Sequence, residues 1–145
     1  MRKFSAEETE RYLESVQPNL FEVSKDQVTK NASIKSLYKL LRKYRSRREL
    51  NISYAGTTDF IECSGISFNE YKEYLKIQAA HANFIEADFF RVLVGGEKDT
   101  EAEVLNRLSV FNELLSDTSV VIEFHGGWES NLENIERIVE ETEFQ

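Results

Sequence analysis

Hydrophobic and polar residues follow two different patterns along this chain. Short apolar runs, rich in β-branched and aromatic residues, occupy residues 19–23, 50–54, 89–94 and 120–124. Three of these runs are closely followed by glycine, and such runs are typical of β-strands. We therefore predict four strands, whose carboxyl ends lie near Ser24, Gly56, Gly96 and Gly127.

Between the predicted strands, apolar residues recur at spacings of three and four, which is the period of an amphipathic helix. One such series contains Ile34, Leu37, Leu41 and Tyr44, and others begin at Phe68, Val104 and Leu132. Four capping-box patterns, in which Ser or Thr precedes Glu by three residues, stand where the helical periods begin. They are Ser5/Glu8, Ser67/Glu70, Thr100/Glu103 and Ser130/Glu133.

The predicted elements alternate, from helix and strand at the start to a helix after the last strand. The strand ends lie 31 to 40 residues apart, which suits units of two parallel strands joined by a crossover helix. Such alternation implies parallel strands with right-handed crossovers, so the fold class is α/β. Two architectures fit: part of a (β/α)₈ TIM barrel, with about four strands, or a small open flavodoxin-like sheet.

Length and local motifs favour different architectures. The 145 residues suit a single domain that spans residues 1–145, whereas a complete barrel needs roughly 250 residues. An open sheet usually begins with a buried strand and a phosphate-binding loop, but this chain begins with a predicted helix and contains neither GxGxxG nor GxxxxGK[ST]. We therefore expect the chain to be a partial barrel.

Acidic residues outnumber basic residues by 26 to 18, and the formal net charge is −8. A general nucleic-acid binder or a protein held on anionic lipid usually carries excess positive charge, so we expect neither partner. The single cysteine, Cys63, cannot form an internal disulfide, and the first residues lack the apolar core of a signal peptide. No segment approaches the roughly 18 apolar residues of a membrane span. We expect a soluble, cytoplasmic protein.

The richest candidate site follows the last predicted strand. In parallel α/β folds, function gathers at the carboxyl ends of the strands. There the sequence has Glu123, His125, Trp128 and Glu129 close together. Alternation along the strand places Glu123 and His125 on one face, where a cleft-facing carboxylate needs a metal, a basic partner or a raised pKa. Trp128 can form an apolar wall against a sugar ring. An ion pair between Glu123 and His125 explains the pattern equally well.

Two further charged residues lie within predicted strands. Arg91 can contact a phosphate or pair with Glu22 or Glu123 across the barrel, and the sequence does not decide between these. The segment 27–48 contains eight basic residues and no acidic one, which favours a solvated outer helix over a nucleic-acid surface. We expect His81 to lie on a packing face or in solvent, and we expect no catalytic role for Cys63.

Three segments of the chain resemble one known family. Residues 88–96 read DFFRVLVGG, residues 119–127 read SVVIEFHGG, and residues 130–134 read SNLEN. Together they look like the middle of the sugar phosphate isomerase/epimerase superfamily, the xylose-isomerase-like TIM barrels. The resemblance is most specific over residues 88–140 and extends more loosely back to residues 19–23. It covers nearly the whole chain but only about half of a family barrel.

The resemblance implies a divalent metal (Mn, Mg, Co or Zn) held by a glutamate at the end of the fifth strand, which matches Glu123. That glutamate would also be the catalytic group that moves a proton, while the metal stabilises an enediolate. His125 is similar to a histidine for which a substrate contact is implied. Glu129 falls where some members have a substrate-binding glutamate, although the intervening residues differ. With Trp128, Arg91 and Glu22, these residues form the expected substrate site.

The other metal ligands of the family come from later strands, which this chain lacks. We therefore expect a sugar or sugar phosphate isomerase/epimerase-like protein that needs missing strands or a partner to be active. The alternative is a non-catalytic remnant or a sugar-binding α/β module. Because a half barrel has open strand edges, we also expect a homodimer or another form of self-association.

Overall fold

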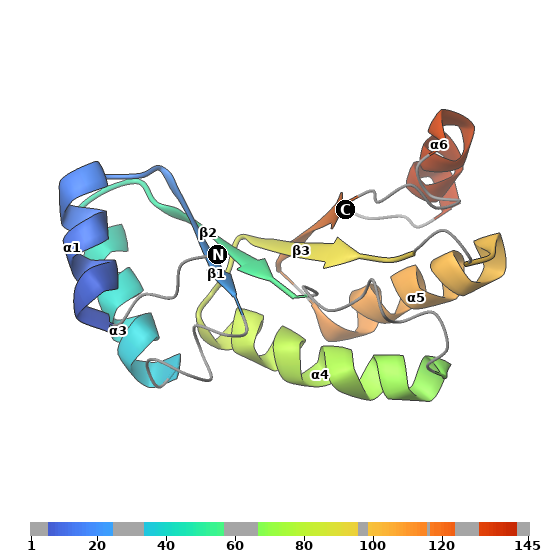
Figure 1. The fold of residues 1–145 in the computed structure, drawn as a ribbon, viewed down its shortest axis with the longest axis horizontal. Helices are drawn as coiled ribbons and strands as arrows, with labels where there is room; N and C mark the ends of the chain where they lie inside the picture. Colours follow the sequence, from blue (N-terminus) through green and yellow to red (C-terminus); the bar gives the residue numbers. More distant parts are fainter. Residues whose placement is uncertain are drawn as a thin grey trace.

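The computed structural model describes residues 6–24, 34–56, 67–95, 99–115, 117–123 and 131–141. Within these ranges helices and strands alternate, as the hydrophobic pattern predicts, and the α/β fold class is confirmed (Figure 1). The helices are α1 (Ala6–Val16), α3 (Ile34–Arg45), α4 (Phe68–Phe84), α5 (Glu101–Leu114) and α6 (Leu132–Glu141). The strands are β1 (Leu20–Ser24), β2 (Asn51–Ala55), β3 (Phe89–Leu93) and β4 (Ser119–Glu123).

The four strands form one parallel sheet in the order β1-β2-β3-β4, so that each strand pairs with its neighbours in the sequence. The register pairs Glu22 with Ser53, Ala55 with Arg91, and Leu93 with Glu123. Because paired residues of adjacent strands lie side by side, this register fixes which side chains share a face of the sheet.

One face of the sheet carries the hydrophobic core. Phe21 lies 6.2 Å from Tyr12 of α1, between ring centroids, and Phe90 lies 5.8 Å from Phe111 of α5. Tyr54 stacks on Phe90 and also contacts α4. Helices α1, α4 and α5 therefore pack against the same face, which we call the helix-packed face; Figure 1 shows α4 and α5 running together along one side of the strands.

Two of the predicted capping boxes are present at helix starts. The Ser67 hydroxyl accepts from the backbone N–H of Glu70, whose carboxylate accepts from the Ser67 N–H, and Thr100 and Glu103 repeat this arrangement at α5. The hydrogen bonds that its carboxylate accepts lower the pKa of Glu70. The boxes at Ser5 and Ser130 lie outside the described residues. At the start of α6, the Asn131 side chain accepts from the backbone N–H of Glu133.

The alternate residues of each strand form the other face, which we call the second face. Its central positions are occupied by small residues of β2, Ser53 and Ala55, which are almost fully buried. Towards the sheet edges it carries two exposed apolar residues, Leu20 on β1 and Val121 on β4. Unlike the helix-packed face, the second face is partly polar, and its charged residues are the candidates for function.

None of the helices in the described ranges combines the length and the apolar character needed to cross a membrane.

Candidate functional site

Three charged residues from three strands meet on the second face. Arg91 of β3 donates from Nε to Glu22 Oε2 at 2.9 Å and from Nη2 to Glu22 Oε1 at 3.0 Å. Its guanidinium therefore forms two parallel hydrogen bonds with the carboxylate of Glu22 on β1. Its third nitrogen, Nη1, donates to Glu123 Oε2 of β4. We call these three residues the Glu-Arg-Glu cluster. Of the alternatives that the sequence leaves open for Arg91, the structure shows the ion pair, and with both carboxylates at once.

The sheet itself explains how the cluster forms. β2 lies between β1 and β3, and its residues beside Glu22 and Arg91 on this face are the small Ser53 and Ala55. A long side chain at either position would block Arg91 from Glu22, whereas these leave room for the guanidinium to reach across β2. Ser53 also donates its hydroxyl to Glu22 Oε2, at 3.4 Å. The sequence reasoning missed Ser53, although a serine within an apolar strand was a signal for a polar face.

The cluster is half-buried and remains within reach of a ligand. The side chains of Glu22, Arg91 and Glu123 are 32%, 29% and 36% exposed. Charge-assisted bonds of this kind are stronger than neutral ones, and partial burial shields them from solvent screening. Glu123 is the last residue of β4, so it stands at the carboxyl end of the sheet, where α/β proteins place their chemistry.

The remaining residues of the expected site are His125, Trp128 and Glu129, and all three lie outside the described residues, as does Cys63. The structure therefore brings Glu22, Arg91 and Glu123 together and leaves the position of the other three as a prediction. In particular, the alternative ion pair of Glu123 with His125 is not tested, but Glu123 already has a cationic partner in Arg91.

His81 lies on a packing face, which is one of its two expected locations. Its Nδ1 is 3.1 Å from the hydroxyl of Tyr54, a fully buried residue of the helix-packed face. Burial lowers the pKa of His81. Burial also raises the pKa of Tyr54, and the nearby Tyr74 raises it further. Both groups are therefore neutral at pH 7, and the pair supports packing on the side of the sheet opposite the Glu-Arg-Glu cluster.

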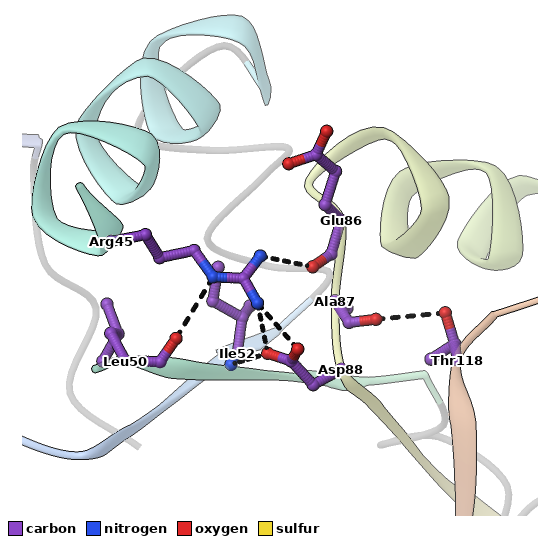
Figure 2. Close-up of polar contacts among 7 residues, drawn as sticks. All are labelled: Arg45, Leu50, Ile52, Glu86, Ala87, Asp88 and Thr118. Atoms are coloured by element: carbon purple, nitrogen blue, oxygen red, sulfur yellow. Dashed lines mark hydrogen bonds and ion pairs between the residues drawn. The ribbon is translucent and has the colours of Figure 1, made fainter. Parts of the chain in front are cut away.

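A second group of polar residues lies at the other end of the strands (Figure 2). Arg45, at the end of α3, donates to both carboxylate oxygens of Asp88 at 2.7 Å and to the carbonyls of Leu50 and Glu86. Asp88 also accepts from the backbone N–H of Ile52 at 2.7 Å. We call this arrangement the Arg45–Asp88 clamp. Arg45, one of the basic residues of the segment 27–48, thus helps to hold the fold together and does not lie on a solvated helix face.

A pocket of about 490 Å³ lies beside this clamp. Its lining comes from the ends of α3 and α4 and from the residues that precede β3 and β4: Arg45, Asn83, Glu86, Ala87, Asp88, Asp117 and Thr118. Thr118 donates to the carbonyl of Ala87, at 3.1 Å. The amino ends of parallel strands usually serve stability rather than chemistry. We therefore infer that the residues at this end of the sheet stabilise the fold and do not take part in the function.

The described residues do not form a divalent metal site. No group of three or more His, Cys, Asp or Glu side chains suited to a metal ion occurs among them. The Glu-Arg-Glu cluster has two carboxylates, but the guanidinium of Arg91 already lies between them. A cation at that position would have to displace Arg91, because two positive groups cannot share it without strong repulsion.

Comparisons of the chain with protein-family models, with curated proteins and with solved structures gave no match. The resemblance to the sugar phosphate isomerase/epimerase superfamily therefore stays a prediction.

Proposed function

We propose that the chain is about half of a (β/α)₈ barrel. The strand order supports this proposal, because a doubly wound, flavodoxin-like sheet has a reversal in strand order and helices on both faces. Here the order is consecutive, and α1, α4 and α5 pack on one face. In a barrel, the second face would be the interior, and the Glu-Arg-Glu cluster would point into it.

On this architecture, the function that fits best is that of a sugar or sugar phosphate isomerase/epimerase. The observation that carries it is the convergence of Glu22, Arg91 and Glu123 from three strands. In such a reaction a carboxylate removes a proton next to a carbonyl, and a positive group stabilises the enediolate oxygen. Glu123 would be the proton acceptor, and Arg91 would donate to the developing oxyanion as it releases Glu123.

The expected divalent metal does not fit the described side chains as they lie, so no step of the proposed reaction uses it. Glu123 and Glu22 would be its ligands only if Arg91 moved away. The role of Glu123 as a metal ligand therefore remains a prediction, and the experiment below is performed both with and without Mn²⁺.

A sugar-binding module without catalysis is the second candidate, and one observation favours it. The carboxylate of Glu123 is held by Arg91, and a carboxylate in an ion pair is a poorer base than a free one. In this case the cluster would recognise hydroxyl groups, and the proton at the carbon next to the carbonyl would stay in place.

The remaining half of the barrel could be a second copy of the chain. Within the described residues, β1 and β4 each pair along one edge only. A two-fold axis along the barrel would place the free edge of β1 beside that of the partner's β4, with the strands parallel, and four strands from each copy would make eight. The exposed Leu20 and Val121 lie on these two strands.

Sedimentation velocity tests this arrangement. We expect a dimer for the full chain, and a shift towards monomer for Val121→Lys, which puts a charge at the proposed junction. A wild-type chain that sediments as a monomer at all concentrations would exclude the second copy as the missing half.

Solvent proton exchange tests the reaction. The full chain is incubated in D₂O with D-fructose or with D-fructose 6-phosphate, and the protons on C1 and C3, the two carbons next to the ketose carbonyl, are followed by NMR. We expect exchange with the wild type and none above background with Glu123→Gln. Glu136→Gln, an exposed residue of α6, is the matched control and should exchange like the wild type.

Two results would refute the proposal. No exchange in the wild type, with or without Mn²⁺, would make the reaction wrong and favour the binding module. Equal exchange in the wild type and in Glu123→Gln would show that Glu123 does not move the proton.

A further inference from the structure

Large apolar side chains that stay exposed are concentrated at the two edges of the sheet. In the part of the chain that the structure describes there are nine of them, and six belong to α1 and β1 at one edge or to β4 and α6 at the other. Apolar residues that gather in this way mark an interaction surface, whereas scattered ones do not. The six residues are Tyr12, Val16 and Leu20 on the β1 side and Val121, Leu132 and Val139 on the β4 side.

Helix α1 buries only one flank of its apolar face. Leu13 is buried against the core, and Glu10 faces α3, because its carboxylate accepts from Lys43 at 2.8 Å. At about 100° per residue, Tyr12 and Val16 lie on the opposite side of Leu13 from Glu10. Their side chains are 37% and 54% exposed. Since α3 joins β1 to β2, this exposed flank of α1 faces the free edge of β1.

Helix α6 has the same arrangement at the other edge. Ile138 is buried, and Arg137 faces α5, where it pairs with Glu101. Leu132 and Val139 stand two turns apart on the opposite side of Ile138 from Arg137. Each is 70% exposed. Since α5 joins β3 to β4, the exposed flank of α6 faces the free edge of β4.

The two flanks cannot cover each other within one chain. Figure 1 shows α1 and α6 at opposite ends of the molecule, with α4 and α5 between them. A second copy related by a two-fold axis brings the α6 edge of one copy to the α1 edge of the other, and the same contact then forms twice. The chain thus supplies, at one edge, an apolar helix flank that fits the flank at the other edge.

We propose that α6 of each copy packs on α1 of a second copy, so that Leu132 and Val139 cover Tyr12 and Val16. This inference rests on the second copy in the proposed function and adds the part of the interface that lies in the helix layer. The contact does not require β1 and β4 to pair. It can therefore be tested separately from the proposed strand junction.

Sedimentation velocity of the full chain over a range of concentrations measures the contact. Val139→Asp places a carboxylate in the apolar contact, and Val16→Lys does the same from the other side with an ammonium group. Each should raise the dissociation constant of the dimer by roughly tenfold or more, because a charge is buried there without a partner. Ile77→Asp is the matched control, since Ile77 is 63% exposed on α4, away from both edges, and should leave the constant unchanged.

A mixture of the two variants tests which helices meet. In a dimer of one Val139→Asp chain and one Val16→Lys chain, one contact is wild type and the other sets Asp against Lys. We expect the equimolar mixture to associate more tightly than either variant alone, by about threefold or more. Circular dichroism shows that each variant is folded, and an unfolded variant would not be rescued by mixing.

Each outcome gives a distinct answer. A dimer that Val121→Lys weakens but Val139→Asp and Val16→Lys do not would overturn the helix contact and leave the strand junction intact. The reverse pattern would support the helix contact and make the strand junction wrong. A mixture no tighter than its components would show that α6 and α1 do not face each other. A wild type that is monomeric at all concentrations would overturn the contact and the second copy, while the proton-exchange assay still decides the reaction.

Discussion

The Arg45–Asp88 clamp predicts a large loss of stability from a single substitution. In Arg45→Met the apolar stem stays, so packing is largely kept, while the bonds to the Asp88 carboxylate and to the carbonyls of Leu50 and Glu86 are lost. The clamp joins the end of α3 to the turn before β3 and to β2 (Figure 2). Its removal should therefore weaken the attachment of a whole helix to the sheet.

The contacts set the size of the effect. A hydrogen bond contributes on the order of 1 kcal/mol net, and about 1.5–3 kcal/mol when one partner is charged. The side chains of Arg45 and Asp88 are 28% and 33% exposed, so water replaces part of what is lost. We expect the free energy of unfolding to fall by about 2–3 kcal/mol. For a domain of this size that corresponds to a melting temperature lower by roughly 6–9 °C.

Urea and thermal unfolding followed by circular dichroism measure this change. Lys43→Met is the matched control, because Lys43 lies on the same helix and pairs with Glu10 at 2.8 Å, but both side chains are well exposed. We expect no measurable change for this variant. If Arg45→Met is as stable as Lys43→Met, the clamp does not stabilise the fold and the reasoning is wrong. Asp88→Asn, alone and with Arg45→Met, measures the coupling energy between the two residues.

Three further predictions concern the core. Gly56→Ala should lower the free energy of unfolding in urea by about 1–3 kcal/mol, because a Cβ at this position would lie 2.1 Å from Cζ of the fully buried Phe90; equal stability would show that the ring can move. Gln78→Leu should raise the same free energy by about 1–2 kcal/mol, since the buried amide of Gln78 has no hydrogen-bond partner among the described residues; a destabilised variant would reveal a partner. Burial lowers the pKa of His81 below its usual 6.5, so the unfolded chain takes up a proton first and stability falls as the pH drops below about 6.5. Stability profiles of the wild type and of His81→Gln should therefore diverge in that range, and parallel profiles would contradict this assignment.

Local signals were sufficient to predict the elements of the fold. The boxes at Ser67 and Thr100 act within one helical turn, so their residue types alone indicate where α4 and α5 begin. The strand bounds differ from the prediction by at most one residue at each end, as for β2, which runs from Asn51 to Ala55. The apolar runs and the helical periods are likewise local properties, and for that reason the alternating order is confirmed.

Contacts between distant residues could not be predicted in the same way. The sequence showed that Arg91 lies in a strand, but its partners depend on strand order and on the small side chains of β2. The clamp was missed because Arg45 looked like one more basic residue of a solvated helix. Its partner, Asp88, lies 43 residues further along the chain, and no local pattern connects the two.

The consecutive strand order also has a kinetic consequence. Paired strand residues lie between 30 and 36 residues apart in the sequence, as in the pairs of Leu20 with Asn51 and of Ser53 with Phe89. Each new strand therefore finds its partner in the segment synthesised just before it, and no strand waits for a distant part of the chain. Because short loop closures are entropically cheaper and faster, the sheet can grow by one strand and helix at a time as the chain leaves the ribosome.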